Sequence, residues 1–258
     1  FESLCRAQLT LVGAPQSLLG TIPAPAAGQI QSTQGGNPNL DPEKARTITA
    51  GIVVTPSFLR NVTVSFDYFN IRVNNAITLP SESDVIDGCF QANSIATLCS
   101  QIFRNPLTGS LSGPADTTFG PVLALSNLGT IKTNGFDLAV RASQSFDFGK
   151  LSFDYAATWT RDFLFQATPA SINRQCVGYY STSCGTPQPK FKSTARLTFS
   201  TGGSDLSLLW RHINSVEVEP LAPAPQRPVG TPTTAGPANV IGGYRKIGAY
   251  DWFDLSFR

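Results

Sequence analysis

The sequence predicts an all-β fold: one part of the wall of an antiparallel β-barrel that crosses a membrane. Apolar and polar residues alternate with period two in segments of about ten residues, the length that spans a bilayer when a strand is tilted. The connections alternate between short and long. Although 41% of the 258 residues are hydrophobic and only 14% are charged, no apolar run approaches the roughly 20 residues of a membrane helix. A helical membrane protein is therefore excluded.

Residues 151–159 show the alternation most clearly. Their apolar set is Leu151, Phe153, Tyr155, Ala157 and Trp159, and the set between them is Ser152, Asp154, Ala156 and Thr158. The same pattern predicts strands at about 62–68, 136–141, 194–199 and 206–211, and weaker patterns predict strands at 45–54 and 246–258. We expect about seven strands, each with one face toward lipid and the other toward a wet lumen.

The connections favour a barrel over a soluble sandwich. Short turns are predicted near 55–60, 144–148 and 201–204, and long polar loops at about 74–128, 162–188 and 214–245. Outer-membrane barrels have short periplasmic turns and long extracellular loops, whereas a sandwich has no reason to place every long loop at one end. Aromatic residues near the strand ends are expected in interfacial girdles, although sandwich core is the alternative: Tyr68, Phe69, Trp159, Phe163, Trp210, Tyr250 and Trp252.

The five cysteines predict an oxidising, extracytoplasmic compartment. Cys89 with Cys99 and Cys176 with Cys184 lack the spacing of a zinc or redox motif, so we favour local disulfides over free thiols or metal ligands. Cys5 is left without a partner. Because the chain has no methionine and no leader-like segment at its start, we expect it to be an internal piece, with the partner of Cys5 in the missing part.

No enzyme, metal site or cofactor is predicted. The one histidine, His212, is expected in a girdle or on the lumen wall, and Asp67, Asp137 and Asp154 are interpreted as solvated wall residues. The net charge of +2 gives no indication of a nucleic-acid partner.

Two disulfide-closed loops are the candidate ligand-contacting elements. The apolar spacing of Ile95, Leu98, Cys99 and Ile102 predicts a short helix, which either contacts ligand together with Phe90 or, as we favour, stabilises the loop. The loop between Cys176 and Cys184 is expected to display Tyr179 and Tyr180. Tyrosine offers an apolar face with a hydroxyl, which suits sugars or siderophore rings, but exposed tyrosines also occur without function. Residues 220–237 are expected to form an extended loop.

Six segments carry a family resemblance. Residues 35–51 read GGNPNLDPEKARTITAG and resemble the G-N-P-x-L-x-P-E signature that precedes a strand in TonB-dependent outer-membrane receptors. Two prolines stiffen this turn, and Glu43 is expected to pair with Arg46 at the lumen rim. Further segments look like the family's later strands, in the same order: 64–77, 128–137, 189–192, 206–211 and 250–255.

The resemblance implies a barrel of around 22 strands in the outer membrane of a Gram-negative bacterium. It also implies a plug, energy relayed by the TonB complex, and a ligand such as a siderophore, cobalamin or an oligosaccharide. Residues 1–258 are then part of one barrel domain, incomplete at both ends, without the plug and the last strands. Two alternatives stay open: a passive channel or adhesin-like barrel, and a secreted, disulfide-bearing sandwich that binds carbohydrate through Tyr179 and Tyr180.

Overall fold

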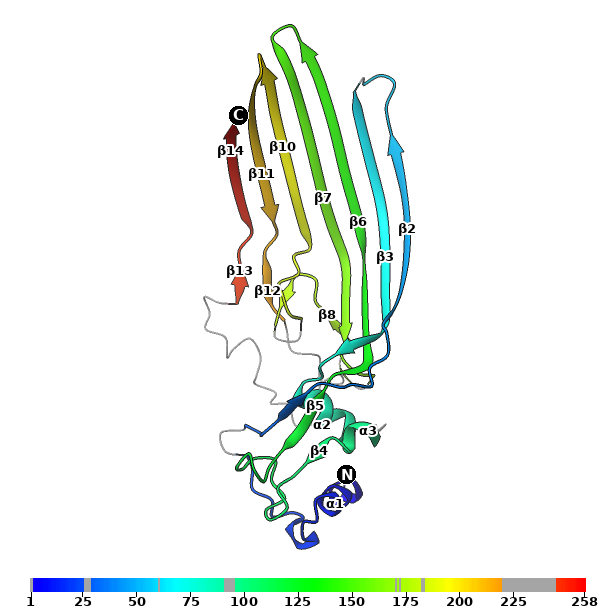
Figure 1. Ribbon diagram of the computed structural model, residues 1–258, viewed down its shortest axis with the longest axis vertical. Helices are drawn as coiled ribbons and strands as arrows, with labels where there is room; N and C mark the ends of the chain where they lie inside the picture. Colours follow the sequence, from blue (N-terminus) through cyan, green and yellow to red (C-terminus); the bar gives the residue numbers. More distant parts are fainter. Residues whose placement is uncertain are drawn as a thin grey trace.

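A curved antiparallel wall makes up most of the chain in this computed structural model (Figure 1). The structure describes residues 2–25, 29–59, 61–90, 96–169, 171, 173–181, 184–219 and 245–258. The strand order is β14-β11-β10-β7-β6-β3-β2, with the short β8 beside β7. The strands are β2 (Lys44–Val54), β3 (Val62–Thr78), β6 (Ser126–Phe146), β7 (Gly149–Gln166), β8 (Arg174–Gln175), β10 (Phe191–Thr201), β11 (Ser204–Ile213) and β14 (Tyr250–Phe257).

The seven predicted strands are present and in the predicted order, but several are longer than the alternation indicates. β3 continues to Thr78, β6 already begins at Ser126, and β7 continues to Gln166. In the β3 extension Phe69, Ile71 and Val73 alternate with polar residues in the opposite phase, so the two faces exchange character. In the β6 and β7 extensions the period-two signal is lost while the backbone pairing persists. The predicted turns are confirmed in place, and the β10–β11 turn is Gly202-Gly203, both with positive φ.

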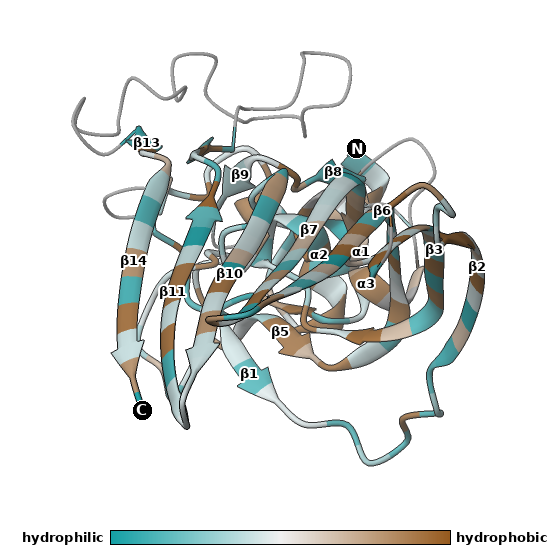
Figure 2. Cartoon of the chain, turned by 90° about the horizontal axis from the view of Figure 1, so that it is seen from above, coloured by the Kyte–Doolittle hydropathy of each residue, from teal (hydrophilic) through white to brown (hydrophobic). Residues whose placement is uncertain are grey.

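The register collects the apolar sets of the strands on one face. Phe66 pairs with Leu138, Val140 with Tyr155, and Leu197 with both Phe153 and Leu208. The opposite face carries rows such as Thr63, Arg141, Asp154 and Arg196. Figure 2 shows the resulting hydrophobic and hydrophilic stripes along the strands of a single curved layer.

The apolar face is not covered by protein, which rules out the sandwich. Phe66 is 46%, Leu197 42% and Leu255 72% exposed. The other two sheets in the described part of the chain are small and lie at the long-loop end (Figure 1). On β6 the apolar band runs from Phe146 to Phe136, about ten residues, which spans roughly 24 Å for a strand tilted by about 45°. This height matches the lipid-facing band of outer-membrane barrels.

The two ends of the wall differ. The turns β2–β3, β6–β7 and β10–β11 lie together at the upper end in Figure 1, and the helices of the described residues lie beyond the lower end. The lower end holds α1 (Glu2–Leu11), η1 (Gln16–Leu18), β1 (Thr33–Gly35), α2 (Glu82–Phe90), α3 (Ala96–Cys99), β4 (Ile102–Phe103) and β5 (Gly120–Ala124), and separately β9 (Tyr179–Tyr180), β12 (Val216–Val218) and β13 (Lys246–Ile247). None of the helices in the described ranges has the length and apolar character to cross a membrane.

The girdle prediction is correct for only some of the aromatic residues. By register, Tyr68, Trp159 and Trp210 lie on the apolar face. Tyr250 and Trp252 lie on the polar face, where their rings are 5.4 Å apart. The sequence assigned them to the girdle because they lie near the end of a predicted strand, and that position alone does not determine the face.

The face assignment predicts the effect of a charge near the middle of the band. We expect Phe153→Arg to lower the free energy of unfolding of the complete barrel by about 2–4 kcal/mol, because the guanidinium would enter hydrocarbon. Ser152→Arg, whose side chain points to the wet face, should cost much less. Urea titration of both variants in lipid vesicles measures the difference, and equal losses would contradict the assignment.

Candidate functional site

A small disulfide-closed module caps the long-loop end of the wall. Its core consists of Val85, Cys89, Leu98, Ile102 and Leu123, all buried, and the disulfide Cys89–Cys99 joins α2 to α3 with a Cα–Cα distance of 4.6 Å. The predicted disulfide is present. The predicted helix is shorter than expected: Ile95 lies outside the described residues, and Ile102 begins β4. The module therefore combines helices with a short sheet.

Helix α2 was not predicted, although its sequence carries a start signal. The Ser81 amide and hydroxyl both donate to the Asp84 carboxylate, at 3.0 and 2.8 Å, and the Asp84 amide donates back to Ser81 Oγ at 3.2 Å. This reciprocal pattern is a capping box with aspartate in the third position. The motif Ser-x-x-Asp at 81–84 was the available signal.

Phe90 lies at the end of α2, half-buried, and packs against the module core together with Ile86 and Leu111. Such packing stabilises the module. A contact between Phe90 and ligand stays a prediction.

Helix α1 closes the other side of the module. Leu9 is fully buried, and the Gln8 side chain donates to the carbonyl of Cys99. Arg104 donates to the carbonyl of Gly109 at 3.1 Å; burial lowers the pKa of its guanidinium, and the neighbouring Cys5 raises it. Arginine nevertheless keeps its charge in proteins. Cys5 has no disulfide partner within the described ranges.

The segment 35–43 joins the module to the wall through side-chain amides. Asn37 donates to the carbonyl of Leu125 at 3.0 Å, and the side chain of Asn127 exchanges two hydrogen bonds with the Asp41 backbone, at 2.7 and 2.8 Å. The predicted Glu43–Arg46 pair is wrong. Glu43 instead accepts the amide of Ile77 at 2.7 Å, because the pleat turns Arg46 to the lipid side of β2.

A second loop unit contains the two predicted tyrosines. The disulfide Cys176–Cys184 has a Cα–Cα distance of 5.5 Å, as the spacing predicted. Tyr179 and Tyr180 form β9, which pairs in parallel with β12, and both side chains are half-buried rather than fully displayed. The predicted loop at 220–237 lies outside the described residues.

One carboxylate fastens this unit across two loops. Glu219 accepts a hydrogen bond from Arg174 at 3.0 Å and another from the Ser181 hydroxyl at 2.7 Å. The Arg174 and Glu219 side chains are only 21% and 14% exposed, so little water competes for them. This pair could not be predicted from the sequence, because its members are 45 residues apart in different loops.

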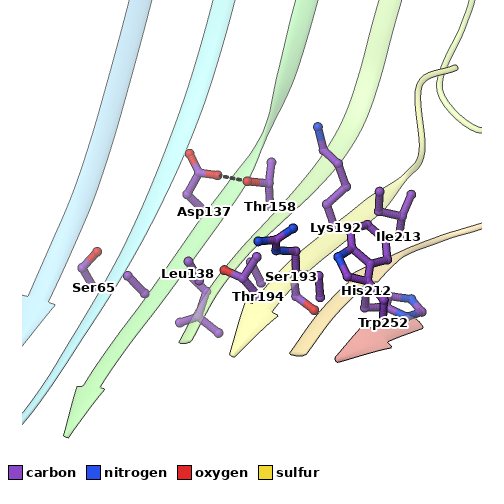
Figure 3. A pocket seen from close by; sticks show the side chains of 14 residues that line it. Ser65, Asp137, Leu138, Thr158, Lys192, Ser193, Thr194, His212, Ile213 and Trp252 are labelled. Atoms are coloured by element: carbon purple, nitrogen blue, oxygen red, sulfur yellow. Dashed lines mark hydrogen bonds between the residues drawn. The ribbon is translucent and has the colours of Figure 1, made fainter. Parts of the chain in front are cut away.

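A hollow of about 400 Å³ lies on the polar face of the wall (Figure 3). Small residues from four strands form its floor: Ser65, Ala139, Ala156 and Thr194. At its margin Thr158 donates to Asp137 at 2.7 Å, and the Arg211 guanidinium lies 5.8 Å from the Trp252 ring. Lys192 adds a second positive charge. A surface with small side chains at its centre and both negative and positive side chains around them can receive a polar chain or solute.

Possible metal ligands and the position of His212 complete the description of the titratable residues. In the part of the chain that the structure describes, no cluster of three or more His, Cys, Asp or Glu side chains could hold a metal ion. His212 lies on the apolar face at the loop end of β11, where its Nδ1 is 2.8 Å from Asp251 and its Nε2 is 2.8 Å from Asn214. This placement agrees with the girdle interpretation of His212.

An open, one-sided antiparallel wall with loops gathered at one end defines a piece of an outer-membrane β-barrel. The family model for the TonB dependent receptor-like β-barrel matches residues 13–258, so the chain belongs to the TonB-dependent receptor family. Members are transporters of the Gram-negative outer membrane rather than enzymes.

Three receptors are among the solved structures to which this chain is similar. The FrpB iron transporter from Neisseria meningitidis matches with a TM-score of 0.48 and 11% identity over 88% of this chain and 26% of its own. The siderophore receptor PirA from Acinetobacter baumannii matches with a TM-score of 0.48 and 13% identity, over 87% of this chain and 26% of its own. A mutant of the ferric enterobactin receptor PfeA from Pseudomonas aeruginosa matches with a TM-score of 0.48 and 11% identity, over 83% of this chain and 23% of its own. The chain thus spans about a quarter of these structures. No curated protein matches the sequence.

Loss of the Arg174–Glu219 pair should destabilise the two loops that it joins. Glu219→Gln should cost about 1–3 kcal/mol, because a half-buried arginine loses its charged acceptor. Glu217→Gln is the matched control, since its pair with Lys246 is 59% and 57% exposed and should contribute little. Limited proteolysis between β7 and β10 should accelerate only in Glu219→Gln. The same rate in both variants would show that the pair does not hold the loops.

Proposed function

We propose that this chain supplies part of the wall and of the ligand-gathering loops of a receptor that actively imports a scarce nutrient. The observation that carries the proposal is the gathering of two disulfide-closed units at one end of a wall of this family. Folded loop units lose less conformational entropy on binding a ligand than open loops of the same length. Such units suit capture of a dilute solute.

The nutrient classes in this proposal are siderophores, cobalamin and oligosaccharides. Tyr179 and Tyr180 are the proposed contact residues, because each is only partly buried on a fixed strand. Phe90 is proposed as a contact through the accessible part of its ring, with the Cys89–Cys99 disulfide as its support.

The domain assignment belongs to the same proposal. Residues 1–258 form a piece of one barrel domain of around 22 strands, in which other strands pair with the free edges of β2 and β14. A plug contacts the polar face, and TonB supplies the energy. The hollow beside Asp137 and Lys192 is a suitable surface for that plug.

Uptake by cells that carry the complete receptor tests the proposal. Three labelled nutrients are offered: a ferric siderophore, cobalamin and an oligosaccharide. The cells should import only one of these classes. Uptake should stop when TonB is deleted or the proton-motive force is collapsed. Tyr179→Ala and Tyr180→Ala should each raise the half-saturation concentration about 5- to 30-fold, as truncation of an aromatic contact does.

The control is Leu107→Ala, at an exposed apolar position of the other loop unit, which should leave uptake unchanged. Uptake that persists without TonB would identify a passive channel instead. Energised uptake with unchanged half-saturation in both tyrosine variants would overturn the contact residues alone.

A further inference from the structure

The lumen face of three adjacent strands changes from polar to apolar as the strands approach the loops. Between the turns and Asp137, these strands carry mostly polar or small side chains on this face. Beyond that level, six large apolar residues of β3, β6 and β7 share it: Phe69, Ile71, Val73, Ile131, Phe163 and Phe165. We call these six residues the inner apolar patch.

The pleat alone places four of the six residues. Side chains two residues apart on a strand share a face, so Phe69, Ile71 and Val73 lie on the lumen face together with Asp67. Ile131 is directly opposite Val73 and joins them. Phe69 was expected in the interfacial girdle, and this prediction is wrong because the residue has the phase of the polar side chains.

A bulge in β7 brings the two phenylalanines to the same face. The register between β6 and β7 shifts at Arg161, which has no partner on β6. One extra residue reverses the faces of the residues that follow it. Phe163 and Phe165 therefore face the lumen, although Trp159 faces lipid. The girdle prediction for Phe163 is wrong for this reason.

The backbone of β6 allows the patch to pack closely. A Cβ atom at Gly135 would lie 2.8 Å from Cζ of Phe69, so the glycine leaves room for the ring against the strand. Val73, Ile131 and Phe165 are direct neighbours across the three strands. All six patch residues are half-buried. They form one continuous surface.

The patch lies at the root of the loop unit that contains Tyr179 and Tyr180. The Phe163 carbonyl accepts a hydrogen bond from the Cys176 amide at 2.8 Å, and the Phe163 amide donates to the Gln175 side chain at 2.9 Å. The disulfide-closed loop therefore begins directly at the patch. An apolar surface leads from the loop proposed to hold the nutrient into the lumen.

Size and chemistry indicate the occupant of the patch. Three strands over two steps of two residues cover roughly 14 by 10 Å, far below the about 800 Å² per partner of a stable protein interface. The patch positions include no charged residue, and the exposed Thr47 and Thr49 border them on β2. An apolar surface with a few polar groups at its edge suits a small molecule.

We propose that the inner apolar patch binds a flat apolar or aromatic part of the imported nutrient. This inference rests on the proposed function and narrows its ligand classes. The aromatic rings of catecholate siderophores and the methylated ring of cobalamin offer such a part, whereas an oligosaccharide carries hydroxyl groups over most of its surface. Phe69 and Phe163 can stack on a ring, and Ile71 and Ile131 exclude water beside it.

Binding of small probes to the complete receptor in lipid nanodiscs tests the patch. The parent should bind either a ferric tris-catecholate or cobalamin, and neither ferric citrate nor maltoheptaose. Ile71→Thr/Ile131→Thr should bind the same probe about tenfold more weakly, because the hydroxyl groups interrupt the apolar surface. Threonine keeps the branched shape that suits a strand.

Two further variants separate the loss of apolar surface from other effects. Ile71→Val/Ile131→Val keeps the patch apolar and should bind within about threefold of the parent. Val53→Thr/Leu209→Thr makes the same kind of change on the lumen face outside the patch and should bind like the parent.

Unchanged probe affinity in Ile71→Thr/Ile131→Thr would overturn the inference, and so would a parent that binds only ferric citrate or maltoheptaose, or none of the probes. A lower unfolding midpoint of this variant with unchanged affinity would show that the patch contacts protein instead. TonB-dependent uptake would still support the proposed function in these cases. Patch-dependent binding without TonB-dependent uptake would contradict the proposed function alone.

Discussion

The polar backbone has to satisfy its own hydrogen bonds inside lipid, and the rest of this structure depends on that requirement. A strand meets it only by pairing along its whole length with neighbours on both sides. Pairing fixes the pleat, and the pleat sends alternate side chains to lipid and to water. Phe153 and Ser152 are adjacent in the chain, yet they lie in different solvents for this reason.

The wall also determines where the loops can act. Because consecutive strands are antiparallel, every second connection lies at the same end, and the disulfides, helices and small sheets all gather there. Asn37 and Asn127 fix the approach of the first module through backbone hydrogen bonds, and Glu219 connects two later loops. The loop end is therefore built from specific polar contacts, whereas the membrane-spanning part rests on hydropathy.

The sequence predicted the part of the fold that lipid dictates. Residues 151–159 repeat one two-residue rule, so the strand, its lipid face and its place in a barrel could be inferred, and both local disulfides followed from spacing. Contacts between distant loops follow no period. The pairing of Tyr179 with Glu217, and the opposition of Arg46 and Arg72, become visible only with the register.

Accessibility of nitroxide labels along β10 tests the lipid-facing wall most directly. Labels placed one at a time at residues 194–199 of the complete receptor in membranes should alternate with period two. Those at 195, 197 and 199 should collide with lipid-dissolved oxygen, and those at 194, 196 and 198 with a water-soluble nickel complex. Absence of alternation, or alternation in the opposite phase, would contradict the account.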